Sequence, residues 1–173
     1  NHSSDNTEQL LKSEGIINNP VIKYVYLDEN IGGSGGFYTG LKMAYEDGYD
    51  FICLMDDDGR PADNKMMEVL VKTAEKLYST NKRLLLNSLV CGSDNILSFG
   101  LNGGIKNKQI AAEREKNGLI MGTINPFNGT LVSKELVEKI GYPNKDFFIK
   151  GDEQDYYYRA LKADAFVATV FDS

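Results

Sequence analysis

The sequence of 173 residues has no tryptophan, one histidine and two cysteines. A single histidine, His2, cannot form a histidine-rich metal site, and its place in a polar opening turn predicts an exposed ring. Cys53 and Cys91 lie in separate apolar runs without Cys-x-x-Cys spacing, which favours reduced thiols over a disulfide or a zinc site. These scarcities exclude a disulfide scaffold and place the chain in a reducing compartment, the cytoplasm.

Long hydrophobic runs and an excess of positive charge are also missing. The longest purely apolar runs, such as residues 84–86, are far shorter than the roughly 20 residues that span a bilayer. Nineteen Lys and Arg against 25 Asp and Glu give a net charge of -6, which disfavours nucleic acid and acidic membrane surfaces as partners. We therefore expect no nucleic-acid binding, and peripheral contact with the inner face of the cell membrane only through segments outside this sequence.

The remaining composition is that of an ordinary globular protein. Hydrophobic residues make up 42% and charged residues 25% of the chain, and the length suits one compact domain or a large piece of one. The sequence opens on Asn1 rather than on methionine. We expect residues 1–173 to form one domain and to be a fragment of a longer chain.

Apolar runs and helical spacings alternate along the sequence. Strands are predicted at residues 21–27, 51–55, 84–91, 127–132 and 165–170, and helices at residues 5–15, 36–48, 61–77, 133–141 and 152–162. Residues 92–122 have the composition of an irregular segment, with a hairpin near residues 96–99. This order predicts an α/β fold with a mainly parallel sheet and helices on both faces, in which ligands bind beyond the carboxyl ends of the strands.

Three aspartates, Asp56, Asp57 and Asp58, follow the strand predicted at residues 51–55. Adjacent carboxylates repel one another unless a cation or a proton compensates, and Asp56 and Asp58 point to the same side of an extended backbone. Mg2+ or Mn2+ takes one or two carboxylates and completes its shell with water and phosphate oxygens, which would bring a nucleotide to the same place. The alternative is a solvated acidic turn before the next helix.

A glycine-rich stretch follows the strand predicted at residues 21–27, with the sequence Asn30-Ile31-Gly32-Gly33-Ser34-Gly35-Gly36. At a strand-to-helix turn, these glycines would let a ligand approach the backbone, and the free amides of a helix start favour anions. The stretch fits neither a Gly-x-Gly-x-x-Gly pattern nor a P-loop, which argues against a dinucleotide enzyme and a nucleoside triphosphatase. The alternative is a tight turn in which the glycines have only a structural role.

A third cluster has the sequence Lys150-Gly151-Asp152-Glu153-Gln154-Asp155-Tyr156. Acidic residues in the first turn of a helix are stabilised by the helix dipole, so capping alone would explain them. A carboxylate at a helix start near a metal site would instead suit a general base. At helical spacing we expect Arg159 to pair with Asp155, and at least one ring of residues 156–158 to face the core.

These clusters occur in the order and spacing of a known enzyme family. The opening run at residues 1–7, the glycine-rich stretch with Phe37, the aspartates and the run at residues 148–156 resemble family-2 glycosyltransferases of the GT-A fold. The glycine-rich stretch is most similar to that of the galactofuranosyltransferase and rhamnosyltransferase branch. The resemblance covers nearly the whole chain and implies a Rossmann-like sheet whose first strand precedes Asn1, with a carboxyl-terminal part beyond Ser173.

The resemblance implies a donor and metal site. Asp56 and Asp58 correspond to the acids that bind Mn2+ or Mg2+, and Asp57 corresponds to a donor-binding residue. Part of the donor pocket corresponds to Asn30, Gly32, Gly33, Gly35 and Gly36. A further metal-binding histidine is expected soon after Ser173.

The resemblance also implies a catalytic base. The second acid of the third cluster has this role in the galactofuranosyltransferases and corresponds to Glu153. Relatives usually carry aspartate at this position, so Asp152 is a rival for the role. Thr130 and Leu131 stand where many relatives have aromatic residues.

The implied activity is an inverting, metal-dependent transfer of a sugar from a UDP- or dTDP-linked donor. The acceptor would be a saccharide or a lipid-linked molecule in the synthesis of a bacterial cell-surface polysaccharide. Glu153 would take the proton of the attacking hydroxyl, while the metal at Asp56 and Asp58 neutralises the departing diphosphate. Two alternatives stay open, a nucleotidyltransferase and a non-catalytic domain that binds nucleotide sugars.

Overall fold

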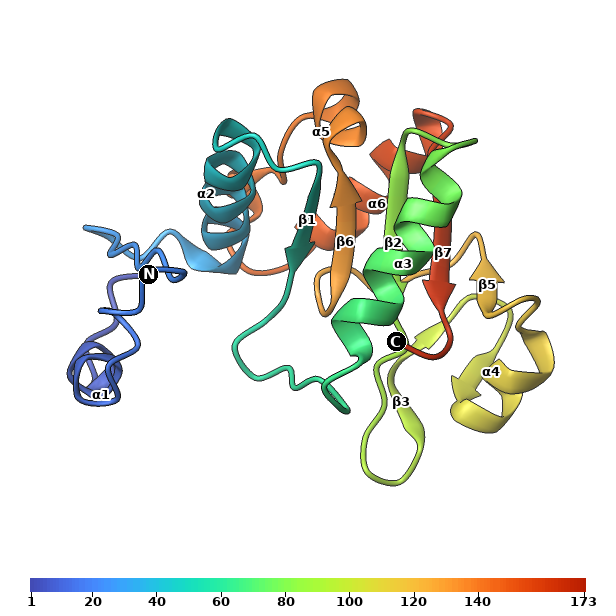
Figure 1. The fold of residues 1–173 in the computed structure, drawn as a ribbon, viewed down its shortest axis with the longest axis horizontal. Helices are drawn as coiled ribbons and strands as arrows, with labels where there is room; N and C mark the ends of the chain where they lie inside the picture. Colours follow the sequence, from blue (N-terminus) through green and yellow to red (C-terminus); the bar gives the residue numbers. More distant parts are fainter.

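The structure is a computed structural model that describes residues 1–173, and its centre is a five-stranded sheet (Figure 1). The spatial order of the strands is β1 (Phe51–Leu54), β6 (Thr130–Ser133), β2 (Leu84–Ser88), β7 (Phe166–Val170) and β5 (Leu119–Met121). Every residue of the middle strand, β2, is buried, as its uniformly apolar start predicts.

Strand directions in this sheet are mixed. β1, β2 and β7 run the same way, whereas β6 and β5 run against them. The α/β class is confirmed, but β2 and β7 form the one pair of neighbours with parallel pairing, because β6 separates β1 from β2. The chain enters β6 after the long segment that follows β2, and β6 then runs antiparallel to both β1 and β2. Composition alone does not predict this direction.

Helices cover both faces of the sheet, as expected. One face packs against α2 (Gly32–Glu46), α5 (Lys134–Ile140) and α6 (Asp152–Lys162), and the other against α3 (Met66–Tyr78). Figure 1 shows α3 crossing in front of β2 and β7, with α6 behind the sheet. The alternation in β2 explains this division, since Leu85 joins the first core and Leu84 and Leu86 join the second.

A smaller unit follows β2 and has its own apolar cluster. It consists of a hairpin, β3 (Ile96–Leu101) and β4 (Ile105–Asn107), followed by α4 (Lys108–Arg114). The hairpin confirms the expectation near residues 96–99, whereas α4 and β5 fall in a segment that we expected to be irregular. Both elements are too short for their apolar spacing to be recognised.

The strand predicted at residues 21–27 is wrong. This segment contains no strand, and Val21 is 86% exposed and Tyr26 46% exposed. No backbone hydrogen bond joins residues 23–27 to any strand. Residues that favour strands do not form one unless the backbone of another strand pairs with them. β1, the edge strand of the sheet, pairs with β6 alone, so residues 21–27 have no partner strand. The preceding helix, α1 (Thr7–Ser13), was expected and buries no residue.

Two helices begin elsewhere than expected. α2 begins at Gly32 rather than near Gly36, so most of the glycine-rich stretch is helical and the turn ends at Ile31. α3 begins at Met66 rather than near Pro61, because the Asp63 carboxylate accepts the Lys65 amide at 2.7 Å and holds a turn there.

Other expectations about single residues are confirmed. Both cysteines are free thiols, and burial raises the pKa of Cys53 to about 11. His2 is exposed, and Tyr156 is fully buried while Tyr158 is exposed. None of the helices combines the length and the apolar character that crossing a membrane requires.

Candidate active site

The three aspartates after β1 are exposed, and they line three different cavities. Asp57 borders a cavity of about 430 Å3 between α2 and β1, and Asp58 borders one of about 750 Å3 beside Arg60 and Lys108. Asp56 lines a third cavity of about 600 Å3 together with Asp152 and Glu153. We call this third space the carboxylate cavity.

The carboxyl group of Asp56 has a raised pKa. Although the residue as a whole is exposed, partial shielding of its carboxyl group from water raises the pKa of Asp56 first, and repulsion from Asp58, Asp57 and Glu153 raises it further. The loop therefore brings the triplet and the acidic start of α6 within electrostatic reach of each other. A simple solvated turn would leave the triplet without this second set of acids.

The start of α6 is shaped by Gly151. This residue has a φ of 100°, and a Cβ there would lie 3.1 Å from the ring of Phe147. Glu153 accepts the Gly151 amide on Oε2 at 2.9 Å and is half-buried on the cavity wall. Glu153 thus accepts an amide at the start of its own helix and also lines the cavity, so capping and a chemical role are compatible.

Asp152 has a different environment. It is 4% exposed, and burial raises its pKa, followed by a hydrogen bond with Glu153, whereas the Ser34 hydroxyl lowers it. An acceptor hydroxyl has little access to the nearly covered Asp152, so the neighbouring, more accessible Glu153 is better placed to receive its proton.

The glycines of α2 divide into two kinds. A Cβ on Gly32 would lie 2.0 Å from the Phe148 carbonyl oxygen, and one on Gly35 would lie 2.5 Å from the Ile31 side chain. Gly33 and Gly36 face open space and border the cavity beside Asp57. Close packing therefore requires the first pair, and the second pair leaves backbone open to a ligand.

Asparagine side chains hold the start of α2. Asn30 accepts the Gly32 amide on Oδ1 at 3.0 Å. Asn1 also contacts the start of α2. Its Oδ1 accepts the Ile31 amide at 2.9 Å, and its Nδ2 donates to the Gly32 carbonyl at 2.8 Å. Asn30, expected in the donor pocket, thus has a capping role in this structure, and Asn1 shares it.

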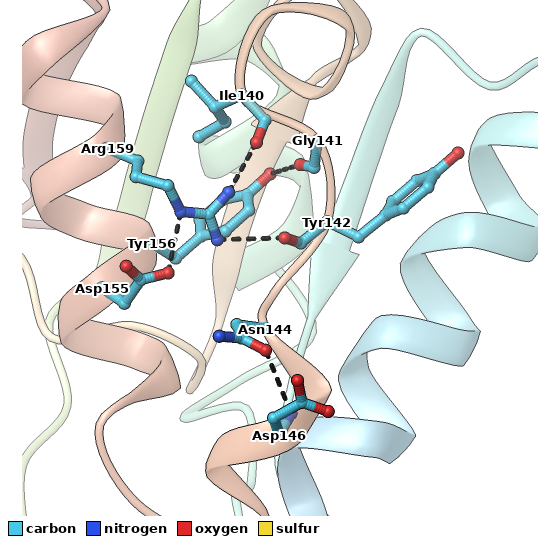
Figure 2. Close-up of polar contacts among 8 residues, drawn as sticks. All are labelled: Ile140, Gly141, Tyr142, Asn144, Asp146, Asp155, Tyr156 and Arg159. Atoms are coloured by element: carbon cyan, nitrogen blue, oxygen red, sulfur yellow. Dashed lines mark hydrogen bonds and ion pairs between the residues drawn. The ribbon is translucent and has the colours of Figure 1, made fainter.

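A network around Arg159 holds the loop before α6 (Figure 2). Its guanidinium donates to Asp155 at 2.7 Å, as expected, and also to the carbonyls of Ile140 at 2.5 Å and Tyr142 at 3.0 Å. The Tyr156 hydroxyl donates to the Gly141 carbonyl at 3.2 Å. These contacts fix α6 against the end of α5, from which the chain runs on to the start of α6.

Other cavity residues come from segments to which the sequence assigned no function, and they are Phe99, Asn102, Asn125 and Asn128. Lys150, Tyr157 and Tyr158 line the same cavity from the third cluster and its helix. Tyr157 is anchored by donating to the Gly122 carbonyl at 2.8 Å. No spacing in the sequence marks Phe99 or Asn102, because the hairpin that carries them has no family pattern of its own.

Asp56 and Asp58 are the residues that the resemblance assigns to a divalent cation. No group of three or more His, Cys, Asp or Glu side chains is arranged to hold a metal. Two carboxylates with uncompensated repulsion nevertheless suit Mg2+ or Mn2+, which fills its remaining positions with water and phosphate oxygens. The donor set is therefore compatible with an ion that binds together with a nucleotide diphosphate.

An α/β sheet with acids beyond a strand end, and with a glycine-rich helix start and an acidic helix start on the same cavity, is the arrangement of the GT-A glycosyltransferases. Residues 1–81 match the family described as "Glycosyl transferase family 2". The chain belongs to this family and is galactofuranosyltransferase-like.

Relatives of known name support this assignment. The chain is 31% identical to galactofuranosyltransferase GlfT1 of Mycolicibacterium smegmatis, over 81% of this chain and 48% of that protein. It is 33% identical to galactofuranosyltransferase GlfT1 of Mycobacterium tuberculosis, over 87% of this chain and 50% of that protein. The chain thus spans about half the length of the curated relatives it matches. No solved structure matches the chain significantly.

Proposed function

We propose that this chain carries the catalytic site of an inverting, metal-dependent glycosyltransferase that acts in cell-surface polysaccharide synthesis. The observation that supports it most is that Asp56, beyond β1, and Glu153, at the start of α6, line one cavity, and that the charge of Glu153 raises the pKa of Asp56. A single displacement needs a diphosphate site and a base that can reach the same sugar, and one shared cavity provides for both. The acceptor would be a saccharide or a lipid-linked molecule, and residues 1–173 would act as one catalytic unit.

Glu153 is the base in this proposal. Its carboxylate takes the proton of an acceptor hydroxyl as that oxygen forms a bond to the anomeric carbon, while the bond from this carbon to the donor diphosphate breaks. Attack and departure occur on opposite faces of the sugar, which inverts the configuration. Asp152 stays beside the base as a buried partner.

Asp56 and Asp58 would hold Mn2+ or Mg2+, and Asp57, Gly33 and Gly36 would border the nucleotide sugar. When bound, the cation supplies neutralisation of the charge that grows on the leaving diphosphate. Gly32, Gly35 and Asn30 support this site by fixing the start of α2. The donor would be UDP- or dTDP-linked, and the names of the relatives make galactofuranose the first sugar to test.

A donor screen with the full-length protein tests the proposal. The protein is incubated with Mn2+, an acceptor glycan preparation and UDP-galactofuranose, UDP-galactopyranose or dTDP-rhamnose, and the released diphosphonucleoside is measured. We expect Glu153→Gln to lower kcat by at least about a hundredfold while the Kd for UDP stays the same. The control Glu75→Gln removes a charge at an exposed position of α3.

The outcomes separate the alternatives. Full turnover by Glu153→Gln would show that the base lies elsewhere, with Asp152→Asn as the next variant. UDP binding without release from any donor would favour a non-catalytic binding domain.

A further inference from the structure

The hydroxyl group of Ser34 is buried in the first turn of α2. The residue is 1% exposed, and its Oγ has no hydrogen-bond partner. Buried hydroxyl groups almost always have a partner, because a lost hydrogen bond to water is otherwise uncompensated. Ser34 lines the carboxylate cavity together with Asp152. Its hydroxyl is therefore available for a polar group in this cavity.

The backbone of Ser34 is fixed against the segment that leads into α6. The Ser34 amide donates to the Phe148 carbonyl at 3.0 Å. The same carbonyl oxygen would lie 2.0 Å from a Cβ on Gly32, so the two segments are in close contact. This packing holds Ser34 beside the start of α6 through its backbone alone, which leaves the hydroxyl free for another role.

Asp152 is the side chain that responds to this hydroxyl. Burial and the hydrogen bond with Glu153 raise the pKa of Asp152, and the hydroxyl of Ser34 lowers it by stabilising the ionised form. The other charged groups at the cavity are Asp56 beyond β1 and Lys150 before α6. Ser34 thus opposes the burial that would otherwise keep a proton on Asp152.

We propose that Ser34 is a positioning residue of the transfer reaction, whose unpartnered hydroxyl turns to donate a hydrogen bond to the Asp152 carboxylate and so keeps Glu153 free to accept a proton. This inference rests on the proposed function. Without the hydroxyl, Asp152 holds its proton more tightly, so the hydrogen bond from the protonated Asp152 carboxyl group to the Glu153 carboxylate forms more often. That contact occupies the oxygen that would take the proton of the acceptor hydroxyl, and the base is weakened although no residue that touches the substrate has changed.

Three variants separate this role from a structural one. Ser34→Ala removes the hydroxyl, and Ser34→Thr retains it. The matched control, Thr39→Ala, removes a hydroxyl from the next turn of the same helix, where Thr39 donates to the Gly35 carbonyl at 2.8 Å. Thermal unfolding of each variant establishes that it folds.

The first readout needs no turnover. Carbon NMR of the side-chain carboxyl groups, without metal, follows the titration of Asp152 in each protein. We expect the pKa of Asp152 to be higher in Ser34→Ala than in the wild type, because the stabilising donor is lost, and unchanged in Thr39→Ala. An unchanged pKa of Asp152 in folded Ser34→Ala overturns the inference.

The second readout is kinetic. We expect Ser34→Ala to lower kcat about tenfold, the size of one hydrogen bond to a charged group, with the donor KM unchanged. Activity recovers as the pH is raised, and Ser34→Thr restores it. A lower kcat at every pH without rescue by Ser34→Thr also overturns the inference. No transfer by the wild type overturns the proposed function instead, and the NMR titration then still decides whether the hydrogen bond exists.

Discussion

Gly32 and Gly33 are neighbours in the sequence with opposite surroundings. Gly32 has a φ of +72° and faces the Phe148 carbonyl, whereas Gly33 has open space at the position of a Cβ. We expect Gly32→Ala to lower the free energy of unfolding by at least ~1 kcal/mol through strain and collision. Gly33→Ala should keep or slightly raise stability, since alanine is the better helix former. Urea unfolding of both variants measures this difference.

The same pair tests the donor site. Gly33 borders both the carboxylate cavity and the cavity beside Asp57. A methyl group there should weaken UDP binding in the presence of Mn2+ by calorimetric titration, although the protein remains folded. Equal stability of Gly32→Ala and Gly33→Ala, or unchanged UDP binding by Gly33→Ala, would contradict the assignment of one glycine to packing and the other to the ligand.

At this scale the sequence predicted which residue types gather at the site, but not which role each residue has. The sequence assigned the base to Glu153 and kept Asp152 as a rival, and the difference between them in the structure is burial, which depends on how α6 packs against α2 and the sheet. Asn30 belongs to a motif read as donor-binding, yet its side chain accepts a backbone amide. A motif predicts where such groups gather, and only packing decides which of them faces the cavity.

At the scale of elements, segments with an internal pattern were predictable. β1, β2, β7 and α6 have buried apolar runs or helical spacing in their own sequence, and they form where expected. Residues 21–27 have an equally good strand composition but no neighbouring backbone, so the prediction fails. Residues 92–122 bring Phe99 and Asn102 to the site through a hairpin and a short helix whose apolar contacts are mostly made within that unit.

Arg159 joins α6 to the loop after α5, and its planar fork serves three acceptors at once (Figure 2). Lysine cannot reproduce this geometry. We expect Arg159→Lys to lower the free energy of unfolding by about 1–3 kcal/mol, because two half-buried carbonyls lose a charged donor. Chemical denaturation measures the change. The control Lys162→Ala, on the exposed side of the same helix, should change stability by less than about 0.5 kcal/mol.

The consequence of Arg159→Lys for activity follows from the chain path. The loop held by Arg159 continues through the short 3-10 helix Lys145–Phe147 to Phe148, whose carbonyl binds the start of α2. A loosened loop should therefore lower kcat as well as stability. A variant as stable as the wild type would contradict the view that this fork holds the loop.

At the scale of the whole molecule, negative charge is concentrated at the proposed ligand site. The net charge is -6, and at Asp56 several acids act on one another without a cationic partner. Such repulsion opposes folding in the absence of a ligand and favours binding of a cation. The site and the stability of the fold are therefore linked through the same carboxylates.

Asp56→Asn tests this link through the pH dependence of stability. The pKa of Asp56 is raised above 3.8 in the folded chain, so the proton is held more tightly there than in the unfolded chain. The resulting stabilisation is complete below the unfolded pKa and is lost as the pH rises through the folded pKa. Metal-free Asp56→Asn should therefore unfold at a higher temperature than the wild type near neutral pH, and this difference should shrink towards about pH 4.

The expected gain is below about 1 kcal/mol, because the carboxyl group is largely solvated. Mn2+ should raise the unfolding temperature of the wild type more than that of Asp56→Asn, since the variant has lost one of the two proposed ligands. Glu113→Gln, on the exposed surface of α4, removes the same charge away from the site and should show neither effect. A stability difference between Asp56→Asn and the wild type that does not vary with pH would mean that repulsion around Asp56 is not the cause, and the case for a cation at this strand end would lose its electrostatic support.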